Sequence, residues 1–200
     1  MRPLFMKMSI SLDGFVATES GDNSWVFTSS DESSKAWSVK AGDDASMIIM
    51  GRKSFQAMAP YWPGADSPFA QAMNGLPKAV FTLQGYDPAT AIPDNIKDLP
   101  ASASWSGAEV CKGDLKQIIQ RLKQSTGNGQ GKPILAIGGA QFMRALIATG
   151  EVDLFQLAIH PVILGSGLPI FNGLSSLKDL QLTHCEAFPG GIVIHTYKPL

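Results

Sequence analysis

The residues best suited to chemistry lie in two glycine-containing turns, each between an apolar run and a helix-like segment. The apolar run 47–50 leads into the first turn, and the run 134–137 leads into the second. Each pattern is typical of a buried strand that ends in glycine and feeds a helix, whose free N–H groups attract phosphate. Two such turns, one of them carrying Arg and Lys, predict a ligand with several phosphates, such as a dinucleotide. The candidate residues are Gly51, Arg52, Lys53, Ser54, Gly138, Gly139, Ala140 and Gln141.

Each turn also has a structural interpretation. Arg52 and Lys53 provide charge for the 2′-phosphate of an adenine ribose and Ser54 provides a hydroxyl, but two solvated cations after a strand would look the same. Adjacent glycines are unfavourable in backbone entropy unless a ligand or tight helix–sheet packing requires them. The chain contains neither GxGxxG nor GxxxxGK[ST] at these turns, so the common dinucleotide and P-loop fingerprints are absent.

A third candidate is Asp13, in the sequence Ser-Ile-Ser-Leu-Asp-Gly. Asp-Gly is a common turn, and the alternative is a carboxylate at a strand end beside a reacting ring. The three histidines at 160, 184 and 195 are scattered within predicted strands without zinc-like spacing. We expect them to be structural and expect no metal site.

Switches in apolar periodicity locate the elements that position these residues. Strands are predicted at 5–12, 47–50, 77–83, 134–137 and 152–163, and a C-terminal hairpin at 180–187 and 192–197. Helices are predicted from a cap at 29–31 through 42, at 54–58, from 114 onward and at 140–149. Residues 85–106 are predicted to be surface connection and 127–131 a loop. The alternation predicts a single α/β domain over 1–200, with a mainly parallel sheet and antiparallel strands at its end.

Composition restricts the class of protein. Of 200 residues, 44% are hydrophobic and 16% charged, with a formal net charge of -1. This pattern excludes a basic nucleic-acid footprint, and the longest apolar runs are too short for a membrane span. The first eight residues lack the apolar core of a signal peptide, and the two cysteines form no CxxC pair. We therefore expect a cytoplasmic protein with a small-molecule substrate.

Taken in order, the motifs resemble the dihydrofolate reductase-like superfamily. The matching segments are Ser-Leu-Asp-Gly at 11–14, the turn at 49–55, Val-Phe-Thr at 80–82, Ile-Gly-Gly at 137–139 and the stretch 152–167. The set is most similar to the reductase domain of bacterial riboflavin-biosynthesis enzymes and its stand-alone relatives, from residue 4 to 197. The stretch 161–171 favours this branch over folate reductase proper.

The resemblance implies a three-layer fold, a mostly parallel central sheet with flanking helices, and NADPH across the carboxyl ends of the strands. Residues 51–54 would hold the 2′-phosphate side, together with Thr82. Leu83 stands where folate reductase has a second serine, so one phosphate contact is missing. Residues 138–141 would lie along the pyrophosphate and nicotinamide half, and Ala17 near the nicotinamide.

The implied chemistry is hydride transfer from nicotinamide to a small heterocyclic, pterin- or pyrimidine-like, or carbonyl substrate. Asp13 would be the polar or acid/base residue. Folate reductases carry a carboxylate on the first long helix, and the matching place here is near Ser34 and Lys35, about a turn after Asp31 and Glu32. The resemblance makes activity similar to 5-amino-6-(5-phosphoribosylamino)uracil reductase one option. The sequence has no deaminase zinc signature, so a role in riboflavin synthesis does not follow from the resemblance.

Alternatives remain open at this stage. They are a true dihydrofolate reductase, or a nucleotide-binding or regulatory protein without turnover. The aromatic residues Trp25, Phe27, Trp37 and Trp62 are more consistent with core than with a substrate pocket. A homodimer through 152–163 and the C-terminal hairpin, as in riboflavin-type relatives, and a monomer are both compatible with the sequence.

Overall fold

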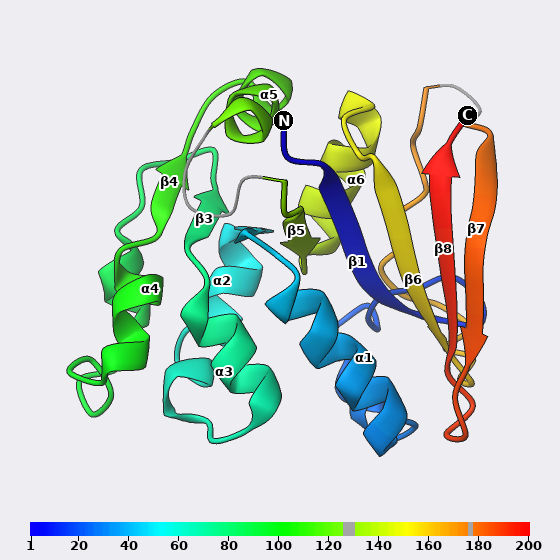
Figure 1. The fold of residues 1–200 in the computed structure, drawn as a ribbon, viewed down its shortest axis with the longest axis horizontal. Coiled ribbons are helices and arrows are strands. Elements are labelled where there is room, and N and C mark those ends of the chain that lie inside the picture. Colours follow the sequence, from blue (N-terminus) through cyan, green and yellow to red (C-terminus); the bar gives the residue numbers. More distant parts are fainter. Residues whose placement is uncertain (126–130, 176–177) are drawn as a thin grey trace.

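One eight-stranded sheet runs through the molecule, in the order β4-β3-β2-β5-β1-β6-β8-β7 (Figure 1). The structure is a computed structural model that describes residues 1–125, 131–175 and 178–200. Strands β1 to β6 are mutually parallel, whereas β8 is antiparallel to both of its neighbours. The predicted α/β class, with a mainly parallel sheet and an antiparallel C-terminal hairpin, is therefore confirmed.

The strands are β1 (Leu4–Ser11), β2 (Met47–Gly51), β3 (Lys78–Phe81), β4 (Glu109–Cys111), β5 (Ile134–Ile137), β6 (Leu154–His160), β7 (Leu180–Ala187) and β8 (Val193–Pro199). The α-helices are α1 (Glu32–Asp43), α2 (Arg52–Met58), α3 (Pro68–Gly75), α4 (Ala103–Ser106), α5 (Leu115–Gln124) and α6 (Ala140–Thr149). Within the described residues the connections also contain short 3-10 helices, among them η1 (Ser24–Phe27).

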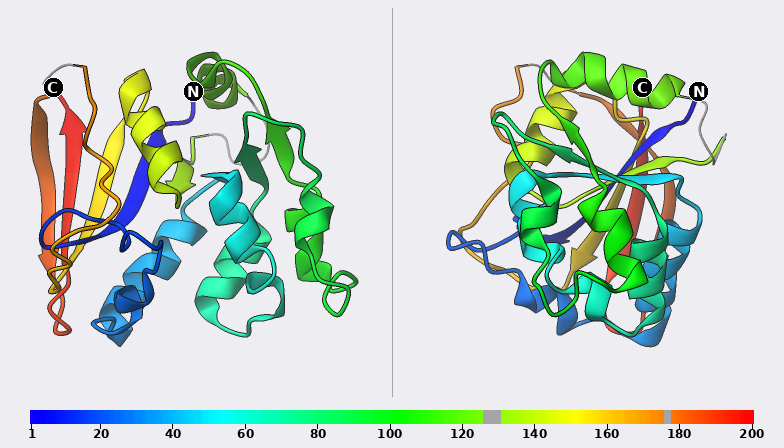
Figure 2. Two further views of the ribbon diagram at one scale, coloured as in Figure 1. Left: turned by 180° about the vertical axis from the view of Figure 1, so that it is seen from behind. Right: turned by 90° about the vertical axis from the view of Figure 1, so that its left-hand side faces the viewer.

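Helices cover both faces of the parallel strands, which is why β2 is buried along its whole length. On one face, Met6 and Met8 of β1 pack with α5 and α6. On the other face, Ile48 and Met50 of β2 pack with α2, α3 and α4. Helices α1 and α3 lie side by side on that second face (Figures 1 and 2).

Two segments differ from the sequence-based expectations. No helix is predicted over 68–75, where the structure has α3, capped by the Ser67 hydroxyl. Residues 85–106 are not simply surface connection, because they contain α4 and the fully buried Trp105. Trp105 covers the ammonium group of Lys78, whose Nζ donates to two carbonyls and to the Ser104 hydroxyl at 2.8 Å each. These contacts draw the segment into the core.

Most other boundaries agree with the predictions to within a few residues. The predicted strand 152–163 is shorter, since β6 ends at His160 before Pro161, which has no N–H for the ladder. Most of the loop predicted at 127–131 lies outside the described residues. In the described part of the chain, no helix is both long and apolar enough to cross a bilayer.

The C-terminal hairpin forms one lateral edge of the sheet (Figure 2). β6 lies inside the sheet, between β1 and β8. Of the two segments considered for a dimer interface, the hairpin is therefore the one that presents an edge strand, and β7 is exposed after its first residue.

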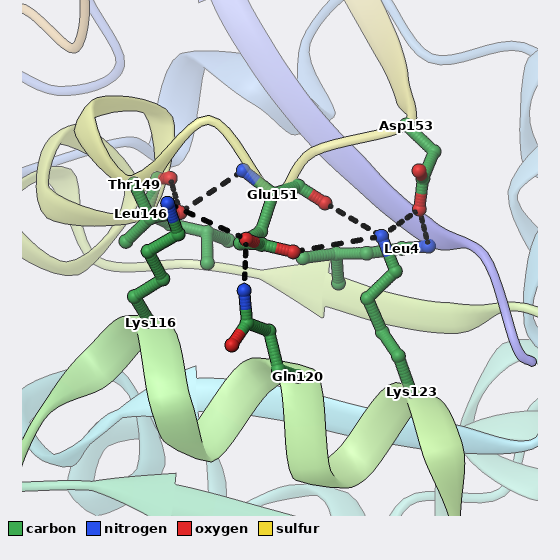
Figure 3. Close-up of polar contacts among 8 residues, drawn as sticks. All are labelled: Leu4, Lys116, Gln120, Lys123, Leu146, Thr149, Glu151 and Asp153. Carbon is green, nitrogen blue, oxygen red and sulfur yellow. Dashed lines mark hydrogen bonds and ion pairs between the residues drawn. The ribbon is translucent and has the colours of Figure 1, made fainter.

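A buried ion-pair network ties α5 to the amino ends of β1 and β6 (Figure 3). The Lys123 ammonium lies 2.6 Å from Asp153 and donates to the Glu151 carbonyl at 3.1 Å. The same Asp153 carboxylate accepts from the Leu4 amide at 2.6 Å. Lys123 is buried, whereas the Asp153 side chain is 42% exposed, so only the ammonium side of the pair is shielded from solvent. The pair joins three elements at the edge opposite the glycine turns.

His160 is a second buried ionisable group, at the carboxyl end of β6. Its Nδ1 lies 2.8 Å from the Ser29 hydroxyl, and its ring meets Trp25 edge-on at 5.3 Å between centroids. Burial, with a further contribution from the Lys7 charge, lowers the pKa of His160 to about 4. The imidazole is therefore neutral at pH 7 and joins β6 to the segment that contains η1, consistent with the expected structural role.

Substituting Lys123→Met should lower the free energy of unfolding by about 2–4 kcal/mol, because it leaves two carboxylates without their buried partner. Lys116 is the matched control, since it lies on the same helix, reaches Glu151 at only 4.0 Å and is largely exposed. Lys116→Met should change stability by less than about 0.5 kcal/mol. Urea denaturation followed by circular dichroism measures both, and equal losses would contradict the assignment.

His160→Asn should reduce the acid sensitivity of the fold. Between the folded pKa of about 4 and the unfolded value of 6.5, the unfolded chain binds a proton that the folded chain does not, so stability falls as pH falls. The slope is up to about 1.4 kcal/mol per pH unit for one such group. Denaturation at several pH values should show this slope in wild type and in exposed His184→Asn, but a shallower one in His160→Asn.

Candidate functional site

The carboxyl edge of the parallel strands contains a topological switch point between β1 and β5. These strands are neighbours, but the chain leaves β1 through α1 toward β2 and leaves β5 through α6 toward β6. Because parallel crossovers are right-handed, the two connections lie on opposite faces of the sheet. The connections that leave β1 and β5 therefore diverge, and a crevice is expected between them. Open α/β sheets bind their ligands in such a crevice.

The two glycine turns meet at this edge and interlock. Gly138 and Gly139 have φ values of +72° and +82°. A Cβ on Gly138 would lie 3.0 Å from both Cβ and Oγ of Ser54, at the start of α2. A Cβ on Gly51 would lie 2.9 Å from that of Phe142 in α6. Backbone conformation and helix packing thus already require these glycines, and the same packing brings the two predicted turns together.

The first turn of α6 offers unpaired backbone donors. Gly139 is the N-cap of this ten-residue helix and makes no side-chain cap. The amides of Ala140 and Gln141 have no intrahelical acceptor, since they precede the first i→i−4 bond. Ala140 is half-buried and Gln141 exposed. An anion at this edge would find these two N–H groups beside the Ser54 side chain.

Arg52 and Thr82 directly follow the neighbouring strands β2 and β3, and Arg52 is the first residue of α2. The Arg52 Nη1 donates to the side-chain Oε1 of Gln84 at 3.3 Å. The backbone N–H of Gln84 donates to the Thr82 hydroxyl oxygen at 3.2 Å. Gln84 therefore brings the predicted cation and hydroxyl to the same place. Lys53 is exposed beside them, and Leu83 is 91% exposed, so no side chain there replaces the missing hydroxyl contact.

Asp13 and Ala17 lie after β1, on a segment that runs beside residues 162–169. The Asp13 carboxylate accepts from the Ser11 hydroxyl at 2.6 Å and from the Gly165 amide at 2.7 Å. Ala17 is buried, and its carbonyl accepts from the Leu168 amide. Both residues are thus at the predicted edge of the sheet, but the carboxylate already has hydrogen-bond donors.

Neither carboxylate near the start of α1 faces β1. Asp31 is the N-cap of α1 and accepts from the Ser34 amide at 2.8 Å and from the Gly190 amide of the hairpin. Glu32 is almost fully exposed and pairs with Lys35. The substitution of either residue for a folate reductase carboxylate therefore has no support in the fold.

A lysine that the sequence analysis missed occupies the region between β1 and α1. The Lys7 Nζ donates to the Ser38 hydroxyl at 3.3 Å and lies 4.8 Å from the Trp37 ring and 5.9 Å from Phe69. Burial lowers the pKa of Lys7 to about 8. The alternation of β1 places Lys7 on the face opposite Met6 and Met8, so the sequence gives no local sign that its side chain is covered by helices.

The predicted aromatic residues divide between core and surface. Trp37 contacts Lys7 and the hydrophobic cluster under the hairpin, and Trp25 contacts His160. Trp62 packs on Phe69. Phe27 is 71% exposed and lies on the surface, unlike the core position expected from the sequence.

Comparison with known proteins agrees with this architecture. Residues 2–194 match the family model of the RibD C-terminal domain. The uncharacterized protein YyaP of Bacillus subtilis is 26% identical over 196 residues, covering 98% of this chain and 94% of that protein.

Two solved structures share the fold. A putative riboflavin biosynthesis protein from Shewanella sp. PV-4 superposes with a TM-score of 0.74 at 20% identity, covering 99% of both chains. The Thermotoga maritima diaminohydroxyphosphoribosylaminopyrimidine deaminase/5-amino-6-(5-phosphoribosylamino)uracil reductase gives 0.62 at 15% identity, with all of this chain matching 57% of that one. With the family match over nearly its whole length, the chain belongs to the RibD C-terminal domain family.

Proposed function

We propose that the protein is an NADPH-dependent reductase that transfers a hydride to a small heterocyclic or carbonyl substrate. The observation that carries the proposal is the convergence at the switch point of bare glycine backbone, free α6 amides and Arg52. Backbone donors and a guanidinium bind phosphate groups well, and their spacing across β2, β3 and β5 suits a ligand with phosphates at separate positions.

NADPH would lie across the carboxyl ends of the strands, in their order in the sheet from β3 through β2 and β5 to β1. Arg52, Lys53 and Thr82 would hold the 2′-phosphate, which distinguishes NADPH from NADH. Residues 138–141 would lie along the pyrophosphate and nicotinamide half, and Ala17 near the nicotinamide. We also place Ser54 beside the pyrophosphate rather than on the 2′-phosphate side expected from the sequence, because its side chain contacts the Gly138–Gly139 turn. NADPH, when bound, supplies the hydride; the protein's own residues orient it and exclude water. The family match and the fold shared with the Thermotoga protein, whose name includes a reductase, support this assignment.

The substrate half would be built around Lys7. Lys7 provides a cation beside α1, whereas folate reductases carry a carboxylate on the first long helix. A cation there favours an electron-rich carbonyl or anionic group over the basic edge of a pterin. We therefore favour a pyrimidine-like or carbonyl substrate. A lysine whose pKa is about 8 can hold a proton near neutral pH and donate it to a developing oxyanion or nitrogen anion.

A second candidate is a nucleotide-binding protein without turnover. The observation that favours it is that the carboxylates of Asp13 and Asp31 both accept backbone N–H bonds. Binding of NADPH without oxidation across pyrimidine, pterin and carbonyl compounds would support this candidate. If titration with NADPH gave no saturable calorimetric or fluorescence signal, both candidates would fail.

Arg52→Ala should weaken NADPH binding by about tenfold or more and NADH binding by less than about twofold, because the guanidinium contacts only the additional phosphate. Lys97→Ala serves as the control, since Lys97 is exposed on a distant connection and pairs with Asp94. Isothermal titration with both nucleotides measures the ratio. Equal weakening of NADPH and NADH would remove the 2′-phosphate role from Arg52.

Lys7→Met should abolish most turnover, by about a hundredfold or more as expected for loss of a general acid, while the affinity for NADPH stays within about twofold of wild type. The substrate for this test is whichever panel compound wild type reduces. Lys35→Met, on the exposed face of α1, is the matched control. A turnover number unchanged by Lys7→Met would contradict the assignment of Lys7 to the substrate half.

A further inference from the structure

Two segments after β1 and β6 are joined backbone to backbone at the edge of the site. Residues 12–17 and 162–169 share three hydrogen bonds: the Leu12 amide to the Val162 carbonyl, the Val16 amide to the Leu168 carbonyl, and the Leu168 amide to the Ala17 carbonyl, at 2.8–3.0 Å. We call these residues the paired segments. They approach so closely that a Cβ on Gly167 would lie 2.3 Å from the Ala17 carbonyl oxygen.

Asp13 fastens the open end of the paired segments. Its carboxylate accepts from the Gly165 amide at 2.7 Å and from the Leu164 amide at 3.2 Å, and from the Ser11 hydroxyl at 2.6 Å. The Ser11 oxygen accepts in turn from the Phe15 amide at 2.9 Å. Residues 164 and 165 are more than 150 positions away in sequence, so this side chain bridges the two segments.

The donors around Asp13 favour its ionised form. The Ser11 hydroxyl, followed by the Gly165 and Leu164 amides, lowers the pKa of Asp13 below its ordinary value. A carboxylate that accepts from three donors, and titrates below its usual range, has no proton to give near neutral pH. This geometry argues against the acid role and in favour of an anchoring one.

We infer that Asp13 is a positioning residue, whose carboxylate holds residues 162–169 against 12–17 and thereby fixes Ala17 at the mouth of the site. The link from Ala17 to the cofactor rests on the proposed function; the anchoring itself does not. Because Ala17 would lie near the nicotinamide, loosening the anchor should affect the part of the cofactor common to NADPH and NADH.

Asp13→Asn tests the inference. The amide oxygen can still accept from the Gly165 amide while the NH2 group donates to the Ser11 oxygen, but the negative charge that strengthens these bonds and the second acceptor oxygen are lost. We therefore expect the link to residues 164 and 165 to be weaker in Asp13→Asn. Asp22→Asn is the matched control, because Asp22 also accepts from an amide and a hydroxyl, both on Ser24 within its own turn. Hydrogen exchange of peptides covering 161–168 should become about tenfold faster or more in Asp13→Asn and stay unchanged in Asp22→Asn.

Nucleotide titration of the same variants tests the consequence for the cofactor. Asp13→Asn should weaken NADPH and NADH by the same factor, about fivefold or more if a charged hydrogen-bond acceptor is lost, whereas Arg52→Ala should change their ratio. If Asp13→Asn yields no folded protein, Ser11→Ala, which removes one donor to the carboxylate, should give the same exchange pattern in weaker form.

Unchanged exchange at 161–168 would overturn the anchor. Faster exchange at 161–168 with unaltered affinity for NADPH and NADH would overturn the role of Asp13 in positioning Ala17 for cofactor binding. If Asp13 is instead an acid, exchange and nucleotide affinity stay at wild-type values and only turnover falls. A wild-type protein that binds neither nucleotide would refute the proposed function, and the exchange measurement would still decide whether Asp13 anchors the segments.

Discussion

The carboxyl edge of the sheet depends on the contact between Ser54 and the Gly138–Gly139 pair. With hydrogen atoms in place of side chains, the β5–α6 turn adopts positive φ and lets the start of α2 approach it closely. Gly51, just before α2, in turn packs closely against Phe142 of α6, so each turn contacts the helix that follows the other turn. Larger residues at these turns would push α2 and α6 apart and would separate the groups proposed to bind phosphate.

Local patterns identified this edge of the site because its signals are short-range. A buried run, a glycine and a helix start are adjacent in sequence at both turns, and parallel strands necessarily end at one edge of the sheet. The eight residues of α3, Pro68–Gly75, begin with proline and end with glycine, and so short a segment has little room for a helical apolar pattern. The sequence therefore does not predict this helix. The burial of Trp105 was missed because it depends on Lys78 and Asn74, on other elements.

Lys7 illustrates what the sequence does not reveal. In a strand that alternates between a buried and a solvent-exposed face, a lysine between Met6 and Met8 is expected to point to solvent. It becomes a candidate functional residue only because α1 and α3 cover that face and place Trp37 and Phe69 around the ammonium group. Whether helices cover this face of β1 depends on tertiary structure, and no local sequence pattern in β1 indicates it.

The distribution of charge at the edge constrains the chemistry more than the fold does. Asp13 and Asp31 each accept backbone amides that join distant segments, and Glu32 points to solvent. The charged groups that we propose for ligand binding at this edge are Arg52, Lys53 and Lys7, which are all cations. A site of this kind stabilises charge that becomes negative during reaction, which suits delivery of a hydride to a carbonyl-type acceptor. If Lys7 lies on the substrate side, as we propose, its ammonium group, with a pKa lowered to about 8, supplies the proton that the carboxylates cannot.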